Sequence, residues 1–189
     1  MNNMNYEQLI NSFVNTNILI IGDVMVDSYL YGKVERISPE APVPVVNVSK
    51  REYRLGGAAN VALNIAKLGG TPYLCSVVGQ DAKADILLNL LDNENLSDEG
   101  IVKDNNRLTT TKFRIIGNNT QMLRVDEEII DTINTDVFDN LCGKIKSIIQ
   151  SKKINGIIFQ DYDKGVVSLE LIQFVTNIAK QQDIPIAVD

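Results

Sequence analysis

The sequence predicts an α/β fold in which a mostly parallel sheet lies between layers of helices. Short continuous apolar runs such as residues 18–21 are typical of strands that are buried on both faces. These runs alternate with longer segments of helical periodicity, which favours strand–helix–strand units. The length of 189 residues, with 44% apolar and 22% charged residues, indicates one soluble globular domain or part of one.

The first half of the chain contains strands and helices with clear end signals. The strand at residues 18–21 ends in Gly22-Asp23, and the strand at 43–48 contains Pro44, which places it at a sheet edge or in a small separate sheet. Residues 58–68 form a helix that Gly69-Gly70 stops. The next elements are a strand at residues 73–78 and a helix that Asp81 caps and that reaches about Leu91.

The second half predicts a hairpin and then a return to alternation. Residues 109–116 and 121–125 read as two strands joined across Gly117-Asn118-Asn119. The expected elements after the hairpin are a helix at 136–151, a strand at 156–159, a helix from its cap Ser168 to Gln182, and a last strand at 184–188. The hairpin and the Pro44 strand do not fit the alternation, so we expect them to form an antiparallel lid over the ligand edge of the sheet.

Composition argues against several function classes. A net charge of −6 without a basic run argues against a nucleic-acid partner, and no apolar stretch approaches the roughly 20 residues that span a membrane. The polar N-terminal residues 1–12 lack the pattern of a signal peptide, so we expect a cytoplasmic location. The absence of histidine excludes Ser-His-Asp and Cys-His catalysis, and Cys75 and Cys142 are expected to be buried reduced thiols rather than metal ligands.

The most informative motif is Leu55-Gly56-Gly57-Ala58-Ala59-Asn60 at the start of the helix. Gly56 and Gly57 have no Cβ, so a ligand can approach their backbone, and Asn60 can donate and accept hydrogen bonds, as sugar hydroxyls require. Together with the small residues that follow, this stretch resembles the N-terminal signature of the ribokinase-like (PfkB) carbohydrate kinases. The resemblance implies a three-layer ribokinase-like sandwich with a small β lid.

Asp23 and Asp27 follow the first strand and could bind sugar hydroxyls through charge-assisted hydrogen bonds. From the residues alone, a turn cap at Asp23 and a solvated carboxylate at Asp27 are equally open. In the resembling family an acidic residue at the position of Asp27 holds the substrate hydroxyls, so we expect Asp27, and with it Asp23, to contact the sugar.

The proline-rich stretch from Arg36 to Val45 extends the resemblance. It could be only a rigid edge connection. With the motifs on either side, however, it resembles the D-glycero-β-D-manno-heptose-7-phosphate kinases of ADP-heptose synthesis, found alone or as the first domain of a bifunctional synthase. The resemblance implies transfer of the ATP γ-phosphoryl group to the anomeric 1-hydroxyl of the sugar phosphate, in lipopolysaccharide-core synthesis.

Cations on the expected hairpin suit a substrate that already carries a phosphate. Lys112 and Arg114 alternate on a strand and therefore share one face. We expect Lys112 and Arg124 to contact the phosphate or the sugar, with Arg114 as the weaker candidate; a solvated hairpin face is the alternative.

The stretch Gln160-Asp161-Tyr162-Asp163-Lys164-Gly165 also matches the resembling subfamily, although it could be an ordinary exposed loop. The resemblance implies that Asp161 faces the site between sugar and nucleotide, and that Lys164 neutralises the travelling phosphoryl group. Asp189 would approach ATP. The implied cofactors are ATP and Mg²⁺, with the metal held mainly through the nucleotide phosphates and no protein metal site.

The family's Gly-Ala-Gly-Asp string, which carries the catalytic base, does not occur in this sequence. We therefore expect the base beyond Asp189, and residues 1–189 to be the N-terminal part of one ribokinase-like kinase domain that is inactive alone. Its lid segments are expected at about 36–50 and 108–126, and a homodimer is expected to form through the lid. The alternatives are a kinase for ribose, fructose or a fructose phosphate, and a non-enzymatic half-domain that binds a sugar phosphate.

Overall fold

The computed structural model describes residues 6–189, and residues 1–5 lie outside the described part. Its larger sheet has five strands, all parallel, in the order β5-β4-β1-β8-β9. These strands are β1 (Asn17–Gly22), β4 (Thr71–Gly79), β5 (Gly100–Asp104), β8 (Gly156–Gln160) and β9 (Ile186–Val188). The sequence predicted this sheet except for β5, whose five residues carry only a short apolar pair, Ile101-Val102, between a glycine and two charged residues.

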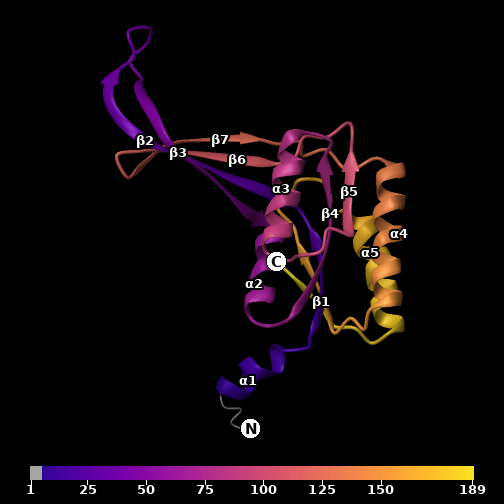
Figure 1. Ribbon diagram of the computed structural model, residues 1–189. Helices are drawn as coiled ribbons and strands as arrows, with labels where there is room; N and C mark the ends of the chain where they lie inside the picture. The colour runs from indigo at the N-terminus through magenta and orange to yellow at the C-terminus, as the bar shows by residue number, and fades with distance from the viewer. Residues whose placement is uncertain (1–5) are drawn as a thin grey trace.

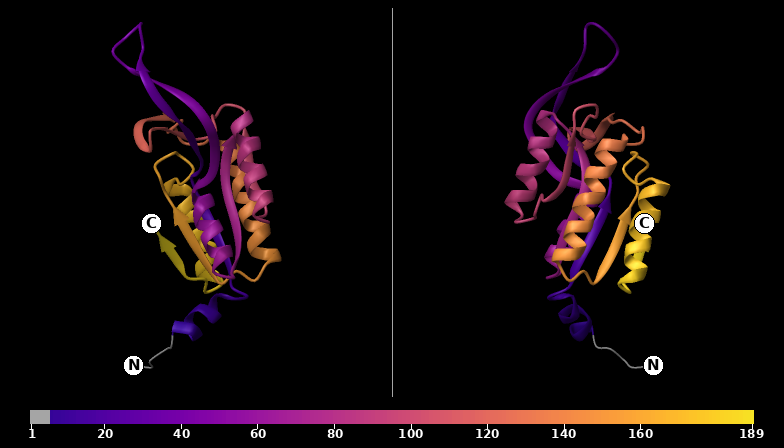
Figure 2. Two further views of the ribbon diagram at one scale, coloured as in Figure 1. Left: turned by 60° about the vertical axis from the view of Figure 1, so that its left-hand side comes forward. Right: turned by 90° about the vertical axis from the view of Figure 1, so that its right-hand side faces the viewer.

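Helices cover both faces of this sheet and give three layers (Figures 1 and 2). One face packs against α4 (Thr135–Ser151) and α5 (Leu169–Gln181), the other against α2 (Ala58–Lys67) and α3 (Ala82–Asn93). Successive residues of β1 serve the two cores, since Leu19 and Ile21 pack toward α4 and α5 while Ile20 packs toward α2 and α3. Burial on both sides explains the continuous apolar run.

A second sheet of four strands projects from the carboxyl ends of the first and forms the lid (Figures 1 and 2). Its strands, in the order β3-β2-β6-β7, are β2 (Val24–Ile37), β3 (Pro44–Gly57), β6 (Thr111–Gly117) and β7 (Thr120–Glu127). β3 pairs antiparallel with β2 and β7 antiparallel with β6, whereas β2 and β6 run parallel. The lid is therefore not purely antiparallel, as the sequence had suggested.

Several expectations about the lid are confirmed and one is wrong. The hairpin across residues 117–119 is present, and β3, the strand with Pro44, lies at the sheet edge. The first lid segment begins at Val24 rather than near residue 36, so Asp27 lies on a lid strand and not in a loop after β1. Gly32 and the many polar residues of β2 concealed its length, because a strand that is half exposed need not be apolar.

Three further features complete the description. α1 (Tyr6–Phe13), for which the sequence predicted no element, lies below the larger sheet (Figure 1). Cys75 and Cys142 are free and buried, as predicted. Within residues 6–189, no helix has both the length and the apolar character needed to cross a bilayer.

Candidate active site

Asp27 on β2 and Asn60 on α2, predicted from separate motifs, line the same hollow at the junction of lid and sandwich. The hollow has a volume of about 390 Å³. Its polar lining also includes Tyr29, Arg54, Asn93 and Glu94. A carboxylate and an amide facing one hollow can bind neighbouring hydroxyl groups of a sugar, with the amide able to donate as well as accept.

Gly56 and Gly57 are required by the packing of the chain itself. A Cβ at Gly56 would lie 2.6 Å from Met25 Cγ and 3.0 Å from Asp27 Oδ2. Gly57 has a φ of 56°, and a Cβ there would lie 2.3 Å from the carbonyl oxygen of Asp23. We expected a ligand to approach the backbone at these glycines, but residues of β2 and Asp23 occupy that space. The missing Cβ of Gly56 instead leaves room for the Asp27 carboxylate.

The Asp27 carboxylate is held by a cation from the neighbouring strand. Arg114 on β6 donates to Asp27 Oδ1, and its guanidinium lies 5.3 Å from the centroid of the Tyr29 ring. Arg114, the weaker candidate in the sequence analysis, is thus the lid cation in direct contact with the predicted sugar-binding carboxylate. An ion pair of this kind fixes the orientation of the carboxylate.

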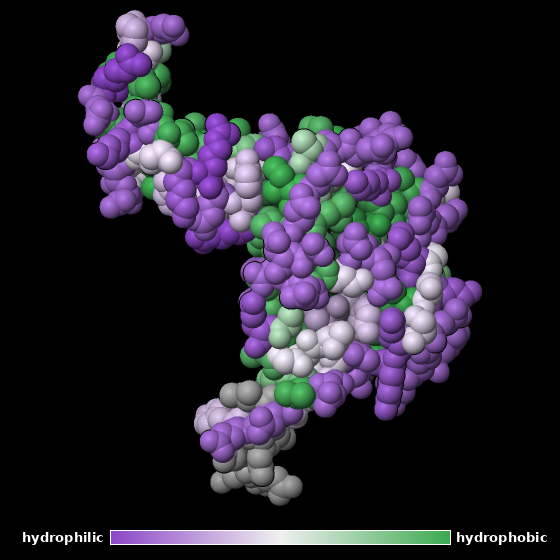
Figure 3. Space-filling view, in the orientation of Figure 1, coloured by the Kyte–Doolittle hydropathy of each residue, from purple (hydrophilic) through white to green (hydrophobic). Residues whose placement is uncertain are grey.

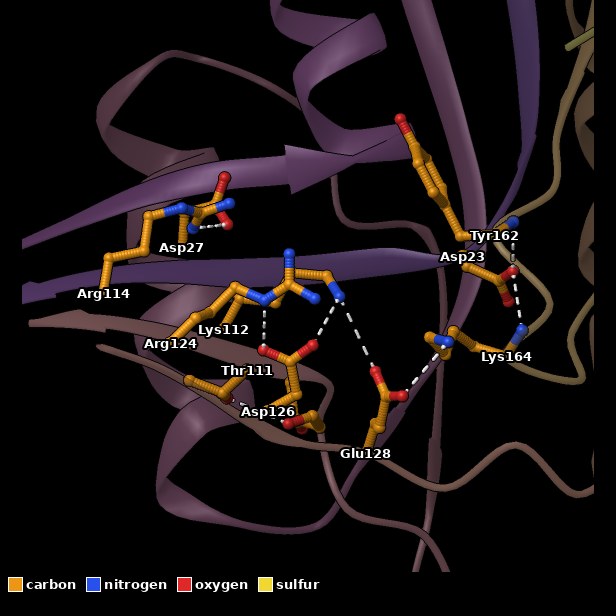
Figure 4. A network of polar contacts seen from close by, with 11 residues as sticks. Asp23, Asp27, Thr111, Lys112, Arg114, Arg124, Asp126, Glu128, Tyr162 and Lys164 are labelled. Carbon is orange, nitrogen blue, oxygen red and sulfur yellow. Dashed lines mark hydrogen bonds and ion pairs between the residues drawn. The ribbon is translucent and has the colours of Figure 1, made fainter. Parts of the chain in front are cut away.

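A second group of charges connects β6 and β7 to the loop after β8 (Figure 4). The Lys112 ammonium lies 3.2 Å from Asp126 and 3.7 Å from Glu128, and Glu128 also pairs with Lys164 at 3.2 Å. Arg124 lies 3.1 Å from Asp126. Lys112, Arg124 and Lys164, for which the sequence analysis predicted separate contacts, are therefore joined through two carboxylates, Asp126 and Glu128, that it did not select.

Glu128 and Asp126 could have been suspected from their spacing. They alternate with Arg124 along one strand direction, which is the pattern of side chains on one face. Their pairing with Lys112 depends on the register of β6 and β7, in which Lys112 lies opposite Asp126. Burial raises the pKa of Asp126, but the combined effect of Lys112 and Arg124 is larger and opposite, so the pKa of this carboxyl lies below its usual value.

Asp23 occupies a different position from the one expected. It is 1% exposed, and its carboxylate accepts hydrogen bonds from the backbone N–H groups of Tyr162 and Lys164 (Figure 4). It also accepts one from the N–H of Val166. Burial raises its pKa despite these bonds. The carboxylate is covered by the loop after β8, so the expected contact with a sugar is corrected to a contact that shapes this loop.

The loop after β8 carries the other predicted residues. Asp161 is exposed and accepts a hydrogen bond from the N–H of Asp163, while Lys164 is half-buried and directs its ammonium to Glu128. Asp189 lies beside the start of this loop, because its carboxylate accepts from Gln160 Nε2 and its carbonyl from the N–H of Asp161. The loop thus gathers at the carboxyl ends of β8 and β9, where ligands bind in open α/β sheets.

Arg107, which the sequence analysis did not select, fastens this loop to the segment after β7. It is 7% exposed and donates to the carbonyl oxygens of Ile129, Lys164 and Asp131 at 3.2, 2.7 and 2.5 Å. Nothing in its sequence neighbourhood distinguishes it from an exposed arginine.

Within residues 6–189, no three acidic or cysteine side chains gather in a position to share a metal ion.

Most of the chain is similar to known carbohydrate kinases and to curated proteins. Residues 15–189 match the model of the pfkB family of carbohydrate kinases. The chain is 46% identical over 164 residues to a bifunctional protein HldE of Helicobacter pylori strain G27, covering 87% of this chain and 35% of that protein. It is 44% identical over 173 residues to the HldE protein of Aliarcobacter butzleri, covering 92% of this chain and 36% of that protein. The chain thus spans about a third of the length of these relatives.

Solved structures show the same fold at lower identity. One is phosphofructokinase-2 from Escherichia coli in complex with fructose-6-phosphate, with 22% identity and a TM-score of 0.63, covering 93% of this chain and 55% of that one. Another is Arabidopsis thaliana ribokinase complexed with ribose and ATP, with 14% identity and a TM-score of 0.61, covering 93% and 53% of the two chains.

Proposed function

The chain belongs to the pfkB family of carbohydrate kinases, and from this membership we propose that it forms the sugar-binding part of a heptose phosphate kinase. The reaction is transfer of the ATP γ-phosphoryl group to the anomeric 1-hydroxyl of D-glycero-D-manno-heptose 7-phosphate. The observation that carries the proposal is that Asp27 and Asn60 line one hollow. The motifs shared with the heptose-7-phosphate kinases and the 44–46% identity to HldE proteins support this choice of sugar.

In this proposal the described residues bind and orient, and the base that takes the sugar proton lies outside them. Asp27, fixed by Arg114, accepts hydrogen bonds from sugar hydroxyls, and Asn60 donates to or accepts from a neighbouring hydroxyl. Lys164 brings a positive charge to the carboxyl ends of β8 and β9, where charge on the travelling phosphoryl group is neutralised. ATP with Mg²⁺ supplies that group, and we propose that the metal is held mainly through the nucleotide phosphates.

The test measures transfer of labelled γ-phosphate from ATP by a polypeptide in which this chain is followed by the rest of its kinase domain. We expect heptose 7-phosphate to give the highest kcat/KM in a panel with ribose, fructose and fructose 6-phosphate. A higher kcat/KM with fructose 6-phosphate would assign the protein to a different sugar. The purified 189-residue chain is expected to transfer no phosphate, and turnover by it would contradict the placement of the base.

We also propose that two copies pair through their lids. The lid face opposite to Lys112 and Arg114 has an apolar hollow of about 440 Å³, lined by Val43, Pro44, Val46, Ile115, Met122 and Leu123. Met122 and Leu123 are 42% and 57% exposed, and Figure 3 shows apolar surface in green along the lid. Sedimentation should give twice the 20.9 kDa chain mass, and Leu123→Asp should give the monomer.

ATP and sugar phosphates are cytoplasmic metabolites, so we place the reaction in the cytoplasm.

A further inference from the structure

We propose that Arg54, assisted by Arg114, recognises the phosphate group that the substrate already carries. The inference rests on the proposed function, because it assumes that a sugar phosphate occupies the hollow beside Asp27. Sequence reasoning favoured Lys112 and Arg124 for this role and did not select Arg54. Arg54 lines the hollow that Asp27 and Asn60 share, whereas neither Lys112 nor Arg124 is part of its lining.

Arg54 and Arg114 approach one aromatic ring from two strands. Arg54 on β3 lies opposite Asp27, and Arg114 on β6 lies opposite Tyr29, so the side-chain alternation of strands places all four on one face of the lid. The guanidinium carbon of Arg54 lies 4.7 Å from the Tyr29 ring centroid, and that of Arg114 lies 5.3 Å from it. Contact with the ring restrains each guanidinium plane, which prepares it for bidentate hydrogen bonding to a phosphate.

The charges around Arg54 leave a positive excess. Glu52 pairs with both Arg54 and Lys50, at 2.6 Å in each case, so two cations share one carboxylate. Asp27 pairs with Arg114. Glu94, another carboxylate of the hollow, is paired with Lys67 at 2.6 Å. Three cations therefore surround two carboxylates on this part of the lid, which favours an anionic ligand.

Accessibility separates Arg54 from Lys112. The Arg54 side chain is 56% exposed and lines the hollow of about 390 Å³, so its N–H groups that do not bind Glu52 can reach a ligand. The Lys112 side chain is 16% exposed, contacts both Asp126 and Glu128, and is not part of the lining of that hollow. A phosphate could use Lys112 only by separating these ion pairs, whereas Arg54 needs no such rearrangement.

The experiment compares a phosphorylated sugar with the same sugar lacking the phosphate. Isothermal titration calorimetry of the 189-residue chain would measure heptose 7-phosphate and free heptose against wild type, Arg54→Met and Lys112→Met. Lys50→Met is the matched control, since it removes a cation from the same Glu52 carboxylate without touching the hollow. Thermal melting of each variant checks that it is folded.

We expect Arg54→Met to weaken heptose 7-phosphate binding about 10- to 100-fold, the loss of hydrogen bonds to a charged group, and to change free heptose binding less than about 2-fold. Lys50→Met removes one charge of this excess but no group that lines the hollow, so it should weaken heptose 7-phosphate binding less than about 3-fold and change free heptose binding less than about 2-fold. Equal effects of Arg54→Met on both sugars, or a phosphate-selective loss in Lys112→Met alone, would overturn the inference while the proposed function stands. Failure of the wild type to bind any sugar phosphate of the panel would overturn both. If another sugar phosphate binds best, that compound and its dephosphorylated form replace the heptose pair.

Discussion

Replacing Arg107 by methionine should destabilise the protein by about 3 kcal/mol. The guanidinium donates to three backbone carbonyls, and the net value of each such hydrogen bond is about 1 kcal/mol. Bonds to a charged donor contribute more than this, but the variant also avoids burying a charge, a cost visible in the pKa of Arg107, which burial lowers. The two effects offset each other in part, which leaves the sum near 3 kcal/mol.

Urea denaturation followed by circular dichroism measures this change. With an m-value of about 2–3 kcal/mol/M, the midpoint should fall by about 1–1.5 M. Hydrogen exchange adds a local readout, because residues 161–166 and 128–133 should exchange faster once the shared donor is gone. The exposed Arg51→Met serves as control and should shift stability by less than about 0.5 kcal/mol. A midpoint for Arg107→Met equal to that of Arg51→Met would refute the reasoning.

Three further predictions concern the backbone, a helix cap and the thiols. Gly57→Ala should lower the free energy of unfolding, measured by urea denaturation, by about 2–4 kcal/mol, because φ is 56° and the new Cβ would lie 2.3 Å from a carbonyl oxygen. Gly143→Ala is the control: its new Cβ would have nothing within 4 Å, and the free energy of unfolding should rise by about 0.5–1 kcal/mol. Burial raises the pKa of Asp81, but hydrogen bonds from backbone N–H groups have the larger, opposite effect, so its net pKa lies below the usual value. The contribution of Asp81 to the free energy of unfolding should therefore be present above about pH 4 and be lost as the pH falls below that. Asp81→Asn should flatten this part of the profile of stability against pH. Burial raises the pKa of Cys75 to about 12 and that of Cys142 to about 11, so alkylation at pH 8 should be about 1000-fold and 100-fold slower in the folded than in the unfolded chain; equal rates would contradict the burial of both thiols.

The sequence could predict elements whose signals are local. The apolar run of β1, the Asp81 and Ser168 caps and the turn at 117–119 each depend on residues close together in the chain, and all are present. β2 escaped prediction because half of its side chains face the charged side of the lid, which removes the apolar pattern of a buried strand.

Site residues could be predicted only as far as their motifs carried chemistry. The meeting of Asp27 and Asn60 followed from the motifs, but the partners of Asp23 depend on a contact with residues more than half the chain away. Arg107 became visible only through its burial, because a buried and an exposed charge look alike in a single sequence.

Asp23 is the one residue between the end of β1 and the start of β2, so the larger sheet and the lid are joined here without a flexible linker. Its carbonyl oxygen receives the first N–H of α2, and its carboxylate receives the loop that carries Lys164. A tilt of the lid must therefore turn a peptide that is bonded to both the sugar-side helix and the loop with Lys164. We therefore expect the angle of the lid and the position of the loop that carries Lys164 to change together rather than independently.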